Sequence, residues 1–339
     1  MRAATAPKRT FLNLARRLEL VGLKREFVRS VLVPSWWTRE DEKDPQLLAE
    51  LEFSIARFLK APIDTVRDPM GQLAIPATSA KLRKPKNLMA EDVAPAVYTA
   101  TMIAQAAVRN LRDVPEYRPL PDEPLELRAE LLAPHREAIT LRALISGLWE
   151  RGIPVIRIST LPAPKFRGMA CWVKDRPVVI LAWGGVDSPK HLNDLAHETG
   201  HIACGHVSAD SLTVDGEKVD DESDQIEKEA NAFQATLLYG EDKWPDLAGL
   251  PVGKGQDMLV LARDIRVKSK QQRIDAGLLA HCWVAKTREY RVESYLLRVL
   301  DKLNAVHEID AAMKDYIDFA GASETDANLL RCVFDEASD

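Results

Sequence analysis

Residues 188–206 read SPKHLNDLAHETGHIACGH, and the elements expected around them follow from this stretch. Ser188 followed by Pro189 is a helix-start signal, because serine is a preferred N-cap and proline is tolerated at the first helical position. The helix is expected to run to about Cys204, since Gly205 follows. Its other positions are mainly apolar, so we expect it to be partly buried. Buried polar groups cost free energy unless they are paired, so His197, Glu198 and His201 on such a helix need a reason.

Short strands are predicted before this helix, and further helices on both sides of it. The strands are three segments rich in valine and isoleucine, Ile153–Ile158, Met169–Val173 and Val178–Trp183. Apolar residues recur at helical spacing in 10–66, 91–112, 136–150, 224–239 and 255–320. The predicted fold class is therefore α+β, a mostly helical chain with a small three-stranded sheet.

Composition divides the chain into parts. Pro115, Pro119, Pro121 and Pro124 fall within ten residues, and the main domain boundary is placed there. The predicted parts are a helical N-terminal domain (1–112), a proline-rich linker (113–125), a central domain (126–245) and a helical C-terminal region (246–339). The C-terminal helices carry no chemical motif, so they either pack on the central domain or form a homodimer interface.

The bulk composition is that of an ordinary globular protein, with 339 residues of which 46% are hydrophobic and 29% charged. No run of 18 or more apolar residues occurs, so neither a transmembrane helix nor a membrane partner is expected. The four cysteines lie far apart without a CxxC pair, which argues against a disulfide framework and a cysteine-rich zinc module. We therefore expect reduced thiols and a cytoplasmic protein.

The predicted helix carries a metal-binding pattern. His197 and His201 are four residues apart and therefore project from one face. Two neutral imidazoles at this spacing can bind a single Zn²⁺. Glu198 is the next residue round the helix, and it can reach a water activated by the metal without itself being a ligand. The residues therefore predict a site for one zinc ion with Glu198 as the general base.

A catalytic zinc needs a third protein ligand, which should come from another element. We favour Glu227 in the segment EKEANAF (227–233), with Glu229 and the acidic loop before it as alternatives. On a helix, Glu227 shares a face with Ala230 and Asn231, while Glu229 points roughly the opposite way. Ala230 would allow a close approach to the histidine helix, and Asn231 could hydrogen-bond a ligand. Without the histidines, Glu227 would be read as a solvated surface carboxylate.

Two motifs together resemble the ImmA/IrrE family of bacterial and phage metallopeptidases. They are HETGHIACGH (197–206) and EKEANAFQATLL (227–238), and the similarity extends over about residues 136–240. The resemblance implies a zincin-like peptidase fold for the predicted central domain, with the short sheet, the HExxH helix and a glutamate-bearing helix. Thr199 and Gln234 depart from the family pattern, which concerns substrate fit rather than metal binding.

Individual residues can be carried over from this resemblance. It implies His197, His201 and Glu227 as zinc ligands and Glu198 as the catalytic base. His206 matches a recurrent histidine of the family. Because it lies nine residues after His197, it is expected to face away from the ligands, in a structural or substrate-side role.

The N-terminal segment is basic and carries a second resemblance. Residues 1–30 contain eight Lys or Arg and two Glu, which leaves a net charge of −11 on the rest of the chain. The segment LARRLELVGLKREFVRSVL (14–32) resembles two helices of an XRE-type helix-turn-helix, which would imply phosphate contacts by Lys24, Arg25 and Arg29. A protein-docking platform or a solvated helix face would fit the same residues.

Three functions are compatible with these features. The family resemblance implies a zinc endopeptidase that cleaves a partner regulatory protein, a small DNA-binding repressor or an antitoxin, in a toxin–antitoxin, phage-control or stress-response system. The alternative is a DNA-binding regulator or protein-binding scaffold with a structural zinc site, which would have no use for Glu198 as a base. A zinc hydrolase acting on a small molecule is disfavoured, because the predicted strands could pair with an extended peptide.

Overall fold

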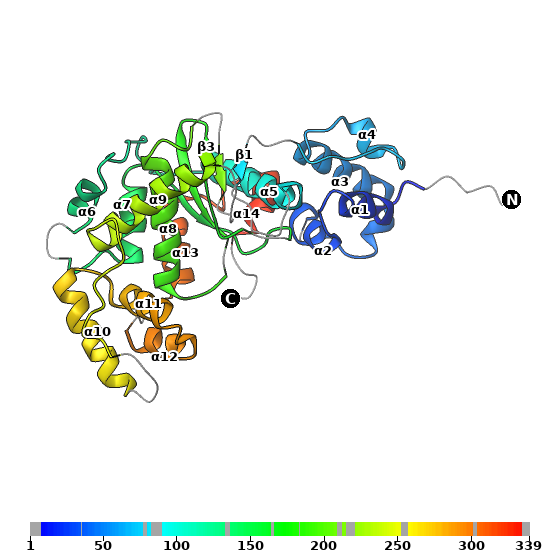
Figure 1. Cartoon of the computed structure of the whole chain (residues 1–339). Coiled ribbons are helices and arrows are strands. Elements are labelled where there is room, and N and C mark those ends of the chain that lie inside the picture. Colours follow the sequence, from blue (N-terminus) through cyan, green and yellow to red (C-terminus); the bar gives the residue numbers. More distant parts are fainter. Residues whose placement is uncertain are drawn as a thin grey trace.

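The structure is a computed structural model, and it describes residues 8–34, 36–76, 80–82, 90–132, 136–163, 166–182, 184–208, 212–214, 221–251, 257–300 and 304–333. The chain is a mixed α and β protein and is mainly helical, as predicted. Figure 1 shows the first helices as one lobe beside a larger lobe that contains the sheet. Trp183, which ends the third predicted strand, lies outside the described residues.

The sheet has five strands in the order β1-β5-β3-β4-β2. The three predicted strands are present as β2 (Val155–Arg157), β3 (Gly168–Val173) and β4 (Arg176–Leu181). Two three-residue strands that the sequence did not indicate, β1 (Ala80–Leu82) and β5 (Leu212–Val214), extend the sheet beyond β3. β3 is antiparallel to both β4 and β5, whereas the β2–β4 and β1–β5 pairs are parallel.

Both faces of the sheet are covered. All six side chains of β4 are buried, and successive side chains of a strand point to opposite faces. Two long helices, α5 (Ala90–Arg109) and α8 (Ser188–Ala203), pack against both β3 and β4. The sheet is therefore the centre of the hydrophobic core in the larger lobe, and α8 is held directly on it.

The remaining helices of the larger lobe follow the predicted helical segments, except α6 and α14, which lie outside them. α8 also contacts α7, α9 and α11, so it lies among helices as well as on the sheet. The helices are α6 (Pro124–Leu132), α7 (Leu141–Trp149), α9 (Asp221–Tyr239), α10 (Met258–Gln272), α11 (Ala276–Thr287), α12 (Tyr290–Leu300), α13 (Ala305–Tyr316) and α14 (Glu324–Leu330). None of the helices in the described part of the chain combines the length and apolar composition needed to cross a membrane.

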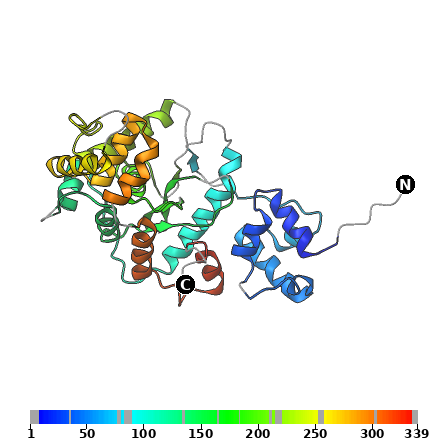
Figure 2. The same ribbon diagram turned by 90° about the horizontal axis from the view of Figure 1, so that it is seen from below.

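The N-terminal lobe contains α1 (Phe11–Glu19), α2 (Arg25–Phe27), η1 (Val28–Leu32), η2 (Asp41–Lys43), α3 (Pro45–Phe58) and α4 (Ile63–Arg67). Figure 2 shows α5 on the side of the larger lobe that faces these helices. Pro95 of α5 lies against Gly22, and the Tyr98 hydroxyl donates to the carbonyl of Phe58. α5 thus contacts both lobes, although its residues fall within the predicted N-terminal domain.

The predicted proline-rich linker packs on the larger lobe. The backbone N–H of Arg118 donates to the carbonyl of Arg151, and the Arg176 guanidinium donates to the carbonyl of Pro115. Leu120 is buried. Residues 113–123 therefore form an irregular segment that is bonded to the larger lobe.

Candidate metal centre

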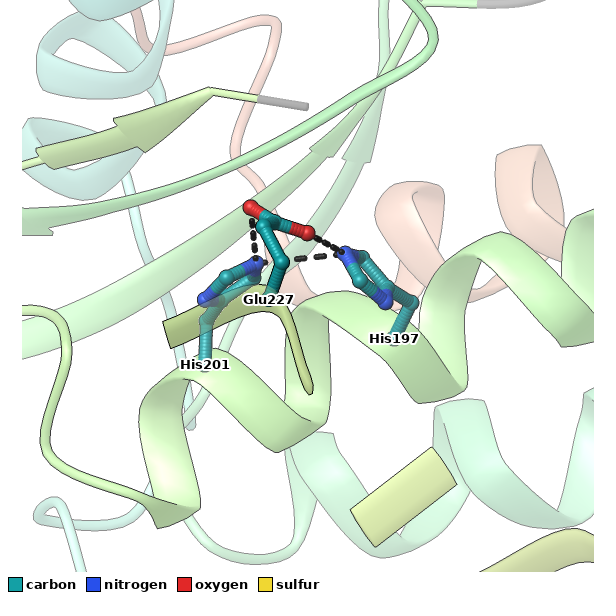
Figure 3. A group of neighbouring side chains, drawn as sticks. All are labelled: His197, His201 and Glu227. Atoms are coloured by element: carbon teal, nitrogen blue, oxygen red, sulfur yellow. Dashed lines mark hydrogen bonds and ion pairs between the residues drawn. The ribbon is translucent and has the colours of Figure 1, made fainter. Parts of the chain in front are cut away.

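Two histidines of α8 and one glutamate of α9 face one another inside the larger lobe (Figure 3). The Nε2 atoms of His197 and His201 are 3.2 Å apart. The Glu227 carboxylate lies 3.2 Å from His197 Nε2 through one oxygen and 3.5 Å from His201 Nε2 through the other. All three side chains are buried, with exposed fractions of 5%, 0% and 6%. The two histidines and Glu227 that the sequence singled out are thus brought together.

A glycine and an alanine allow α8 and α9 to cross closely. A Cβ added to Gly200 would lie 2.8 Å from the backbone oxygen of Ala230, so only glycine fits at this crossing. The Gln234 amide, one turn further along α9, donates to the carbonyl of Asn193 at 2.9 Å. Ala230 was expected to permit this approach, whereas the contributions of Gly200 and Gln234 were not recognised from the sequence.

Burial and mutual contact set the protonation of the site. Burial lowers the pKa of His201, and this outweighs the opposing effect of its contact with Glu227. Burial alone would raise the pKa of Glu227, but its contacts with His197 and His201 hold it well below its usual value. The site therefore favours an ionised carboxylate beside a neutral His201, and these are the protonation states in which both groups bind metals.

Glu198 is almost completely buried, with 1% of its surface exposed. Its carboxyl lies against the backbone of Gly168 at the start of β3, where an added Cβ would be 2.5 Å from Glu198 Oε1. Cys171 of β3 is close enough for the Glu198 charge to act on it, and burial together with this charge raises the thiol pKa to about 12. Glu198 thus points to the sheet side of α8 and does not belong to the group of three ligand-type side chains.

The end of α8 places His206 next to His201, not away from it. The helix ends at Ala203, and Gly205 adopts a left-handed backbone with φ of +71°. The N–H of Gly205 donates to the carbonyl of Ile202, and the N–H of His206 donates to that of His201. These two bonds form a Schellman motif, which turns the chain back over the last helical turn. The expectation that His206 faces away assumed that the helix continued, and it was wrong for that reason.

Asn231 differs from expectation, whereas Glu229 lies outside the ligand group as expected. Asn231 is exposed, and among the described residues it has no hydrogen bond to the two histidines or to Glu227, so its predicted supporting role is not realised. Glu229 points away from this group and lies with Oε2 3.0 Å from His206 Nε2, a contact that the sequence did not indicate. The pKa of Glu229 is lowered by a hydrogen bond from Gln225 and a second one from His206.

The three basic residues of the N-terminal lobe are not equivalent. Arg25 and Arg29 both form ion pairs with Glu42, and both guanidinium groups lie over the ring of Phe11. Lys24 is exposed. Two of the three candidate phosphate contacts are thus engaged with other side chains of the N-terminal lobe.

The buried group fits a divalent metal ion. One ligand atom from each of His197, His201 and Glu227 lies within 4.8 Å of the others. Imidazole nitrogen and carboxylate oxygen donors are typical of first-row transition metals, with bonds of about 2.0–2.2 Å for zinc. No family model matches the chain, and no curated protein or solved structure matches it.

Proposed function

We propose that this chain is a zinc-dependent endopeptidase whose centre is formed by His197, His201 and Glu227. The observation that carries the proposal is the burial of these three side chains together on α8 and α9. Grouping buried polar side chains costs free energy unless a partner satisfies them, and a bound cation would do so here. Two histidines and one carboxylate also leave a fourth position free for water and substrate, as a catalytic zinc requires.

The chemistry divides between the metal and the chain. When bound, Zn²⁺ polarises a carbonyl and lowers the pKa of a water to about 7. Glu198 takes a proton from the attacking water and passes it to the leaving amine. The Glu198 carboxyl lies close to the backbone of Gly168, which limits where it can move on that side. Glu227, whose pKa is held low, is ionised at neutral pH and binds as a carboxylate.

A structural zinc site is the main alternative. Such sites are usually closed by four protein ligands. In the described part of the chain, the group contains three ligand-type side chains. A nearly fully buried glutamate directly after the first histidine has a use in hydrolysis and none in a purely structural site. Both features favour the catalytic assignment.

The substrate class that we propose is a partner regulatory protein, a small DNA-binding repressor or an antitoxin. The support is the resemblance of HETGHIACGH and EKEANAFQATLL to the ImmA/IrrE motifs, in the same order and spacing. The regulatory setting would be a toxin–antitoxin, phage-control or stress-response system.

The test compares the wild-type chain with Glu198→Gln, using zinc content and peptide cleavage as separate readouts. Both proteins should bind about one zinc ion, because Glu198 lies outside the ligand group. With a proteome-derived peptide library and with repressors or antitoxins encoded beside the gene, new N-termini should appear for the wild type. Glu198→Gln should be slower by at least about 100-fold, the usual contribution of a general base.

The matched control is Glu126→Gln, which removes an exposed carboxylate of α6. It should cleave at the wild-type rate. Equal cleavage by Glu198→Gln would exclude Glu198 as the base, and absence of zinc from the wild type would exclude the proposed centre.

A further inference from the structure

One ring nitrogen of His201 faces the proposed metal position, and its other ring nitrogen contacts a second histidine. In Figure 3 its Nε2 faces His197 and Glu227, while its Nδ1 points away from them. That Nδ1 lies 3.0 Å from Nδ1 of His206. His206 in turn lies 3.0 Å from Glu229 through its Nε2. The chain His201–His206–Glu229 therefore runs from the buried site toward the surface.

The positions of these residues are built into the backbone. The Schellman motif at Gly205 brings His206 beside His201, and only 7% of the His206 side chain is exposed. Glu229 stands on α9, two residues after Glu227. Gln225, one turn earlier on the same helix, donates from Nε2 to Glu229 Oε1 at 2.8 Å and holds the carboxylate toward His206.

The contacts of His206 with His201 and Glu229 allow one placement of protons when the imidazole rings of both histidines are neutral. An ionised carboxylate only accepts hydrogen bonds, so His206 must donate to Glu229 from Nε2. A neutral imidazole with Nε2–H has a bare Nδ1, so His206 accepts at Nδ1. His201 must then donate from its own Nδ1, which leaves a lone pair on its Nε2 for a metal. In this arrangement the Glu227 carboxylate accepts its hydrogen bond from Nε2 of His197, which is 3.2 Å away.

We propose that His206 and Glu229 are positioning residues that hold His201 as its Nδ1–H tautomer, with Nε2 presented to the metal. This inference rests on the proposed function for the identity of the ligand at Nε2. Hydrogen bonds to the second nitrogen of a ligating histidine fix its tautomer and orientation, and their loss commonly weakens metal binding by about 10–100-fold. The same loss is expected for His206→Leu and Glu229→Gln.

The tautomers can be read in the metal-free protein by long-range ¹H–¹⁵N spectra of ¹⁵N-histidine-labelled chain, at a pH where the rings are neutral. In the wild type, His201 should carry its proton on Nδ1 and His206 on Nε2. In His206→Leu, the proton of His201 should redistribute toward Nε2. A His201 that carries Nε2–H in the wild type, or one unaffected by His206→Leu, would overturn the proposal.

Zinc affinity, measured by competition with a chromophoric chelator, is the second readout. Glu229→Gln changes a half-exposed side chain, so it should fold normally, yet bind zinc about 10–100-fold more weakly than the wild type. Glu126→Gln is the control and should bind as the wild type does. Unchanged affinity in Glu229→Gln would contradict the assigned role.

The two readouts separate this inference from the proposed function. A wild type with the expected tautomers that takes up no zinc would reject the metalloenzyme but support the histidine orientation. A wild type that binds zinc with His201 in the Nε2–H form when metal-free would support the metal centre and reject the role of His206 and Glu229.

Discussion

The Glu198 carboxyl lies beside Gly168 at the start of β3, where that glycine has no side chain. The space that a Cβ would take at Gly168 is filled by the carboxyl of Glu198. The carboxyl is the far end of a flexible side chain, so a larger residue at position 168 would move it without forcing the strands apart. The position of the proposed base is thus set by a residue 30 positions away in the sequence, on another element.

Gly168→Ala should therefore displace Glu198 and slow cleavage while leaving zinc binding intact. A misplacement of about 1 Å in a reacting group can reduce the rate by about 100-fold, and we expect a loss of this order in the peptide-library assay. Gly184→Ala is the control, because a Cβ there meets no atom within 4 Å. Equal rates for the two variants would show that Gly168 does not position the base.

At the residue scale, the sequence predicted the residue types of the metal group but not the contacts that support them. The spacing of His197 and His201 places both side chains on one helix face, and this placement does not depend on how the helix packs in the fold. His206 was placed wrongly because its direction depends on where the helix stops, and Gly205 reverses the chain there. The contact of His206 with Glu229 joins the segment after α8 to α9, and no local pattern contains that information.

At the element scale, the crossing of α8 and α9 determines the metal group, because each helix supplies part of it. Gly200→Ala should push the two helices apart, since its Cβ would lie 2.8 Å from a backbone oxygen of Ala230, which cannot rotate away. Crowding of this kind costs about 1–3 kcal/mol, against about 1 kcal/mol gained in helix propensity. The variant should lose up to about 2 kcal/mol in urea unfolding and bind zinc more weakly.

The control for this crossing is Gly147→Ala in α7. It gains the same helix propensity, and the atom its Cβ would meet is a methyl group of Leu131, which can change rotamer. Gly147→Ala should keep the zinc affinity of the wild type. If Gly200→Ala also kept it, the close approach of the helices would not matter for the metal.

The end of α9 depends on one buried arginine. Arg128 donates to the carbonyls of Leu237 and Leu238 at 2.7 and 2.9 Å, and to that of Arg273 at 2.9 Å. Arg128→Leu would leave these acceptors without a donor, and we expect a loss of about 3 kcal/mol in the free energy of unfolding. Arg118→Leu, which removes an exposed side-chain bond to one carbonyl, should lose about 0.5 kcal/mol or less. Similar losses in both variants would contradict this role.

Long periodic segments and the apolar strands were predictable from the sequence, whereas short or context-dependent features were not. β1 and β5 have only three residues each, too few for an alternating pattern to emerge. The start of α8 was displaced by one residue, because Asp187 is the N-cap and Ser188 is already helical. Polar residues at adjacent positions make such boundaries ambiguous.

At the scale of the whole molecule, α8 links the site to most of the larger lobe. It packs on β3, β4, α7, α9 and α11, while the N-terminal lobe meets the rest through α5 and α14. Proline content predicted a boundary near residue 115, but the contacts of α5 with both lobes depend on side chains far apart in the chain, which composition does not report. A ligand that stabilises α8 should therefore stabilise the sheet more than the N-terminal helices.

Zinc binding should stabilise the larger lobe selectively. Free zinc at 100 times its dissociation constant would add about 2.7 kcal/mol, or about 4 °C in Tm if all 339 residues unfold as one unit. Hydrogen exchange should show added protection in α8 and α9 first, then in β3, β4 and α7, and little change in α1–α4. Glu198→Gln should retain this protection and His197→Ala should lose it, because only the second change removes a ligand. Equal protection of α1–α4 would mean that the two lobes open together, and retained protection in His197→Ala would place the zinc elsewhere.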